Sequence, residues 1–169
     1  MKFISPIIFF LLILCSFALI RADEDKVSEK EFQIRLQAQE LVKKKKNVEA
    51  IAIIDNYEKA IKGPMHFSFY EYRGSLWASN EKYENALKDY QKAYRIHKTK
   101  ESISGLGLCY LFNKDYFNAE SVFRDGMLSF DENLNFKKSL LQCLLLQERY
   151  REAVSLAESL LIVSPFDKD

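Results

Sequence analysis

Apolar residues recur at spacings of three and four along this chain, and polar residues fill the positions between them. The first such segment runs from Lys26 to Lys46, and its apolar positions are Phe32, Ile34, Leu36, Ala38, Leu41 and Val42. The pattern predicts an amphipathic helix. We expect it to begin near Ser28, because Glu31 follows at the spacing of a capping box. We expect Lys43 to Lys46 to end it, since cations are favourable at the negative end of the helix dipole.

A second helix is predicted from Val48 to Lys62, with Asn47 as its N-cap. Its apolar face consists of Ile51, Ile54, Tyr57 and Ile61. The pair Gly63-Pro64 is a strong stop signal and predicts the end of this helix.

The stretch from Phe67 to Asn133 contains one pattern twice. The first set is Gly74, Trp77, Tyr83, Ala86, Tyr90 and Ala93. The second set is Gly107, Tyr110, Tyr116, Ala119, Phe123 and Gly126, each residue lying 33 places after its counterpart. A fixed order of small and aromatic residues at a fixed spacing indicates a structural repeat.

Two looser copies flank this central pair. Ala38 and Ala50 take the small positions of the copy before it, and Tyr150 and Ala153 lie 34 places after Tyr116 and Ala119. We therefore expect an all-α fold, an α-solenoid of about four helix-turn-helix repeats over residues 31–166. The repeats cover about 31–64, 67–99, 100–133 and 134–166, and tight turns are expected at Asn80-Glu81-Lys82, Asn113-Lys114-Asp115 and Gln147-Glu148-Arg149.

The repeated residues are expected to serve packing. Gly74 should face Ala86 so that the two backbones approach closely, and Gly107 should face Ala119 in the same way. The aromatic residues should fill the space toward neighbouring helices, while Ala93 and Gly126 make room for the next copy. Cys109 and Cys143 are 34 residues apart and should be separated by about 10 Å, which is too far for a disulfide. We expect two buried and inert thiols.

This arrangement resembles the tetratricopeptide repeat (TPR), a family of 34-residue helix-turn-helix units. Both central copies match its small and aromatic positions, and the resemblance covers about residues 31 to 166. The chain departs from the family at Tyr70 and Ile103, where the family prefers Trp, and at Lys98 and Asp131, where it often has Pro. The resemblance implies that the first helices of the repeats line a concave groove that binds another protein.

The resemblance also indicates which residues would line such a groove. They are Arg35, Gln39, Glu71, Ser75, Ser104, Leu108, Leu111, Lys138 and Gln142. Phe112 and Leu145 add apolar surface, which suits an extended or helical peptide with one or two apolar anchors. The Lys and Asn set that holds acidic chaperone tails in some members is missing, so we do not carry that function over. Alternatively, Leu108, Leu111 and Leu145 pack against adjacent helices.

Composition and motifs argue against several other functions. The formal net charge is +1, and removing Lys2 and Arg21 with residues 1–22 leaves 23 basic and 24 acidic groups, so no basic surface for nucleic acid is expected. No nucleophile motif, phosphate loop or HExxH is present, and His66 and His97 lie 31 residues apart. We therefore expect no enzyme, no metal and no cofactor.

The N-terminal segment predicts export. Lys2 precedes an apolar run from Phe3 to Ile20, and Ala22 stands before an acidic stretch, which is typical of a signal peptide cleaved after Ala22. Residues 23–30 would form a short linker. The run could instead remain as a membrane anchor, or Cys15 could be lipidated as in bacterial lipoproteins. Each alternative places the rest of the chain outside the cytosol, in the periplasm or secreted.

Two functional hypotheses follow from the repeat and the leader. In the first, the chain is an interaction module or scaffold that binds a partner protein in an envelope or secretion assembly. In the second, it is a structural subunit that associates with itself through the open ends of the solenoid. The second rests on the last copy, which closes at Pro165 and would leave Leu156, Leu160 and Ile162 exposed.

Overall fold

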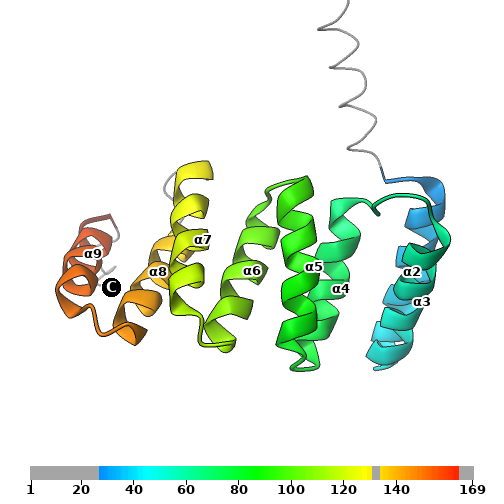
Figure 1. The fold of residues 1–169 in the computed structure, drawn as a ribbon, viewed down its shortest axis with the longest axis horizontal. Helices are drawn as coiled ribbons and strands as arrows, with labels where there is room; N and C mark the ends of the chain where they lie inside the picture. The colour runs from blue at the N-terminus through cyan, green and yellow to red at the C-terminus, as the bar shows by residue number, and fades with distance from the viewer. Residues whose placement is uncertain (1–26, 131–133, 164–169) are drawn as a thin grey trace, which may run out of the picture. The chain divides into compact units, whose positions relative to one another are not determined.

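The computed structural model describes residues 27–130 and 134–163, and all regular secondary structure in these residues is α-helical (Figure 1). The predicted signal peptide or anchor at 1–22, Cys15 and Pro165 lie outside the described residues. The helices are α2 (Glu29–Lys43), α3 (Asn47–Ala60), α4 (Phe67–Ser79), α5 (Tyr83–Ile96), α6 (Lys100–Phe112), α7 (Tyr116–Ser129), α8 (Leu134–Leu146) and α9 (Tyr150–Val163). The predicted all-α, helical-repeat fold is confirmed.

The chain divides into two compact units, Met1–His66 and Phe67–Asp169. In the first unit α2 packs against α3. The predicted capping box at the start of α2 is confirmed, because the Ser28 hydroxyl accepts from the Glu31 N–H at 3.2 Å and the Glu31 carboxylate accepts from the Ser28 N–H at 3.1 Å. The other oxygen of Glu31 accepts from the His66 N–H at 3.0 Å, which ties the end of this unit to α2.

The predicted boundaries of α3 need correction. Lys46 is the N-cap, without a side-chain hydrogen bond, and Asn47 is the first helical residue. The tight turn before α3 explains this start, since the Lys46 N–H already donates to the carbonyl oxygen of Leu41. The helix ends at Ala60, three residues before the Gly63-Pro64 stop.

The second unit is a stack in which each helix packs against the next along the chain, from α4 to α9. Figure 1 shows these helices following one another in chain order. Helix α4 also contacts α6 directly, so the first helices of these two copies are neighbours. This arrangement puts residues that are 33 or 34 apart in the sequence at equivalent positions of successive copies.

The turn inside each copy has the same backbone geometry. Its middle residue is in the left-handed region, with φ near 60° at Lys45, Glu81, Lys114 and Glu148. The N–H of the following residue donates across the turn, as Lys82 does to the carbonyl oxygen of Trp77 and Asp115 to that of Tyr110, both at 2.9 Å. This is the Schellman pattern, which satisfies the last carbonyls of a helix. The three predicted turns of the later copies are therefore confirmed.

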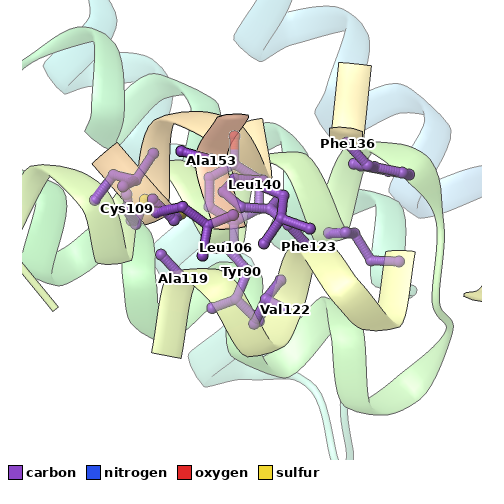
Figure 2. Close-up of a cluster of buried hydrophobic side chains, with 14 residues drawn as sticks. Tyr90, Leu106, Cys109, Ala119, Val122, Phe123, Phe136, Leu140 and Ala153 are labelled. Carbon is purple, nitrogen blue, oxygen red and sulfur yellow. The ribbon is translucent and has the colours of Figure 1, made fainter. Parts of the chain in front are cut away.

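The core of the second unit is built from the repeated small and aromatic residues (Figure 2). Ala86, Ala93, Ala119, Gly126 and Ala153 are buried, as predicted. Trp77, Tyr110 and Tyr116 are partly buried and pack against the same cluster. The small positions of the repeat therefore lie at close helix contacts.

The nearest neighbour of Gly74 is an aromatic ring, and its predicted contact with Ala86 stays a prediction. The closest atoms to a Cβ added at Gly74 belong to the ring of Tyr90, at 3.1 Å, and not to Ala86. At Gly107 the closest atoms belong to Phe123, at 2.4 Å. A Cβ added at Gly105, a position that the repeat pattern does not single out, would lie only 2.2 Å from the ring of Tyr90. The ring of Tyr90 thus lies between a glycine of its own copy and a glycine of the next.

The prediction for Tyr150 also needs correction. The repeat pattern predicts that it packs within the last repeat, but its side chain is 60% exposed. Its counterpart Tyr83 is covered by Phe112, a residue of the following copy. No described helix follows α9, so nothing in the described residues covers Tyr150 in the same way.

Candidate functional site

The exposed face of the first helices in the second unit contains most of the predicted groove residues. We call it the first-helix surface. It consists of Glu71 and Ser75 on α4, Ser104, Leu108 and Phe112 on α6, and Lys138, Gln142 and Leu145 on α8. Ser75, Leu108 and Gln142 occupy the same place in successive copies and are all exposed, so this place is not needed for packing and its chemistry differs in each copy.

The apolar part of this surface is centred on α6. Leu108 and Phe112 are 42% and 59% exposed, and they lie four residues apart, on the same side of the helix. The ring of Phe112 stacks on that of Tyr83, with centroids 4.4 Å apart and planes within 9°. This contact restricts the Phe112 ring while leaving it accessible, which is the property of a preorganised apolar anchor.

A depression of about 440 Å³ lies beside this aromatic pair, where α5 begins and α6 ends. It is lined by Glu81, Lys82, Tyr83, Glu84, Asn85 and Asn113. The apolar anchor therefore has a hollow with polar walls next to it.

The polar residues of the first-helix surface have different roles. Glu71 accepts a hydrogen bond from the hydroxyl of Thr99, the N-cap of α6, so it connects two copies. Ser104 is half-buried, whereas Lys138 and Gln142 on α8 are exposed. Lys138 and Gln142 are thus accessible to a bound segment, and Glu71 serves the fold.

Leu111 and Leu145 occupy equivalent positions, 34 residues apart, but have different environments. Leu111 is 8% exposed and belongs to the core, so its predicted place on the groove surface needs correction. Leu145 is 48% exposed. The alternative interpretation, that these leucines pack against neighbouring helices, therefore holds for Leu111 and not for Leu108 or Leu145.

Arg35 and Gln39, the remaining predicted groove residues, lie on α2 in the first unit, and both are half-buried. The structure therefore brings together the groove residues of α4 and α6, which contact each other directly. Those of α8 lie on the first helix of the next copy, and those of α2 belong to the other unit.

A buried ion pair joins α4 to α5. Arg73 donates from Nε and Nη2 to the two carboxylate oxygens of Asp89, both at 2.7 Å, and each side chain is almost fully buried. A pair of this geometry satisfies both charges internally. It lies in the packed interior, so it supports the fold and is not accessible to a ligand.

Glu120 on α7 is a second buried charge and connects this helix to the turn between α8 and α9. Its carboxylate accepts from Arg124 at 2.9 Å, from Gln147 at 2.8 Å and from Arg149. Burial raises the pKa of this carboxyl, but the hydrogen bonds from Gln147 and Arg124 and the charge of Arg149 outweigh burial, so the pKa lies below its usual 4.5. Glu120 therefore remains ionised at neutral pH and holds the turn between α8 and α9.

Cys109 and Cys143 are buried free thiols, as predicted. Burial raises the pKa of each thiol to about 11, so both are protonated and unreactive at neutral pH. Among the described residues, no group of three or more His, Cys, Asp and Glu side chains is placed to hold a metal ion. In the same residues, no helix is both long and apolar enough to span a membrane.

Comparison with known proteins adds information on the fold. No protein-family model matches the sequence, and no curated protein is detectably similar to it in sequence. The structure is similar to MamA residues 41 to the end from Desulfovibrio magneticus RS-1, with 14% identity and a TM-score of 0.70 over 83% of this chain and 78% of that one.

Two further solved structures are TPR domains by name. The Sgt2 TPR domain from Aspergillus fumigatus has 16% identity and a TM-score of 0.62 over 74% of this chain and 83% of its own. The first TPR of Spaghetti (RPAP3), bound to the HSP90 peptide SRMEEVD, also has 16% identity and a TM-score of 0.62, over 73% of this chain and 99% of its own. Together with the repeat geometry described above, these similarities show that the chain has a TPR-like, all-α helical-repeat fold.

Proposed function

We propose that this chain is a protein-interaction module that binds a segment of another protein on the first-helix surface of α4, α6 and α8. The exposure of Leu108 and Phe112 carries the proposal, because contiguous accessible apolar side chains on a soluble helical stack mark interaction sites. A TPR-like structure with a peptide bound, the first TPR of RPAP3, adds support from the fold.

The chemistry of the surface indicates the type of segment. Leu108 and Phe112 would take an apolar side chain, and aromatic residues are frequent among the few that dominate binding energy. The exposed Lys138 and Gln142 would contact polar groups of the segment on the neighbouring helix. We therefore infer a peptide or short helix with one or two apolar anchors, rather than the acidic tail bound by some members of the TPR family.

The context that we propose is outside the cytosol. The leader at residues 1–22 supports export, and an exported interaction module suits an envelope or secretion assembly. Mass spectrometry of the mature N-terminus tests this part alone. Cleavage after Ala22 is the expected result. An N-terminus at Met1 would support the retained membrane anchor instead, and an acylated Cys15 would support the lipoprotein.

Site-specific photo-crosslinking in living cells tests the binding surface. A photoreactive amino acid placed at Ser75 or Gln142 should crosslink to a partner protein, and mass spectrometry would identify that partner. The same amino acid at Leu128 is the matched control, because Leu128 is an exposed apolar residue on α7, outside the first-helix surface.

Substitution then measures the contribution of the anchor. Changing Leu108→Asp together with Phe112→Ser should weaken binding of the identified partner at least tenfold in a fluorescence anisotropy titration. Leu128→Asp should leave the affinity unchanged. Equal crosslinking from Ser75 and Leu128, or an affinity that survives the double substitution, would remove the first-helix surface from consideration.

A further inference from the structure

The exposed side of α9 has the geometry of a buried repeat interface. Four residues form an apolar stripe on it, at spacings of four, three and four, and we call this stripe the end face: Tyr150, Val154, Ala157 and Leu161. Val154 and Leu161 are 57% and 53% exposed, and Ala157 is half-buried. Such spacing keeps the four side chains on one side of a helix.

The preceding copies show what normally covers these positions. The counterparts one repeat earlier are Tyr116, Glu120, Phe123 and Met127, and all four are buried or half-buried. Three of these positions contact the following copy: Gln147 donates to the backbone carbonyl oxygen of Tyr116 and to the carboxylate of Glu120, and the Phe123 ring lies near that of Phe136. In the copy before, Tyr90 lies against Gly105 of the next first helix. The end face thus corresponds to the surface on which the next copy packs in the two preceding repeats. In both of those repeats a helical copy covers this surface.

A head-to-tail arrangement of two copies does not suit this face. The helix that would dock on it must offer apolar residues where α8 buries Phe136, Leu140 and Cys143 against its neighbours. The first helix of the described residues, α2, has Gln33, Gln37 and Glu40 at the equivalent positions, and all three are exposed. Docking α2 of another copy would bury polar groups against an apolar surface, which is unfavourable.

The end face is complementary to itself instead. If two α9 helices pack antiparallel about a two-fold axis near Ser155, the large Tyr150 meets Leu161 of the other copy, and Val154 meets the small Ala157. Arg151 and Glu158 flank the stripe, lie seven residues apart, and are both exposed. The same axis brings Arg151 of one copy within reach of Glu158 of the other, twice per dimer.

We propose that two copies of this chain associate tail to tail through α9, forming a closed two-fold dimer. A two-fold contact uses the same patch on both subunits and ends growth at two copies. The first-helix surface is not part of the contact, so each dimer would present two copies of it. The proposal stands independently of the partner proposed for that surface.

Light scattering after size-exclusion chromatography provides the first test, on the chain as it is purified from an exporting host. Twice the monomer mass is expected at high concentration, without larger species. Val154→Asp with Leu161→Asp should raise the dimer dissociation constant at least 100-fold, and Leu128→Asp should not change it. A strict monomer, growth beyond two copies, or a dimer unaffected by the double substitution would overturn the proposal.

Charge reversal tests the two-fold axis itself. Arg151→Glu and Glu158→Arg should each weaken the dimer by about tenfold, since each creates two like-charge contacts. A mixture of the two variants should associate as tightly as the unchanged chain, because both contacts then become opposite in charge. Failure of the mixture to recover would exclude this axis, and circular dichroism confirms that every variant is folded.

Discussion

Two copies of the repeat fill the same interior positions with opposite chemistry. Arg73 and Asp89 form a buried, doubly hydrogen-bonded ion pair between α4 and α5. Thirty-three residues later the same two places hold Leu106 and Val122, which are also buried. The backbone of the repeat therefore does not require an ion pair here. Since removing a charge from water costs several kcal/mol per ion, the pair must be complete to be tolerated.

Breaking the pair from one side should have the largest effect. Asp89→Ala leaves the guanidinium of Arg73 buried without its partner, and we expect a loss of about 3 to 5 kcal/mol in the free energy of unfolding. Urea denaturation followed by circular dichroism measures it. The informative control replaces both residues by those of the next copy. The double variant Arg73→Leu with Asp89→Val should have a free energy of unfolding equal to or larger than that of the original chain. A loss below about 1 kcal/mol for Asp89→Ala would contradict the interpretation.

Replacing the equivalent glycines of the two copies should cost more stability at the glycine that has the closer contact. A Cβ at Gly107 would lie 2.4 Å from Phe123, whereas one at Gly74 would lie 3.1 Å from Tyr90. We expect Gly107→Ala to cost about 1 to 3 kcal/mol through overpacking. Gly74→Ala should change stability by less than about 1 kcal/mol, because a small ring shift is offset by better helix propensity. Thermal denaturation of both variants provides the comparison, and equal losses would show that the two contacts are alike.

Glu120 extends the comparison, because Leu87 and Val154 occupy its place in the neighbouring copies. The pKa of Glu120 is lowered in the folded chain. The ionised carboxylate therefore stabilises the fold fully above the usual pKa of 4.5, and this stabilisation is lost as the pH falls through the lower pKa of the folded chain. Glu120→Gln should cost about 1 to 2 kcal/mol at pH 7. The difference between variant and original chain should shrink below pH 4.5 in urea titrations. A difference that stays constant with pH would indicate packing and not charge.

The sequence predicts the repeat because its strongest signals are local. The capping box at Ser28, the turns around Glu81 and Lys114, and the buried alanines depend on residue type and spacing, and all appear in the structure as expected. Asn47 was misplaced by one position because the preceding turn, and not a side chain, begins α3.

The candidate binding surface is less predictable from the sequence because the exposure of its residues depends on contacts between copies. Leu111 and Leu145 have the same residue type and the same repeat position, but one is a core residue and the other is exposed. Residue type and spacing therefore do not predict which of the two is accessible. The Arg73–Asp89 pair was missed for a related reason. Its signal is the comparison of copies, in which two charged residues replace Leu106 and Val122, and not any motif within one copy.

The position of the Tyr90 ring between Gly74 and Gly105 has a consequence for how the stack opens. Because this ring packs against both α4 and α6, moving either helix away from α5 would leave it incompletely packed, so α4, α5 and α6 should exchange their amide hydrogens as one cooperative unit. Helix α9 has a neighbour on one side only among the described helices. Its amides should therefore exchange through smaller, independent openings, and unfolding of the stack should begin there.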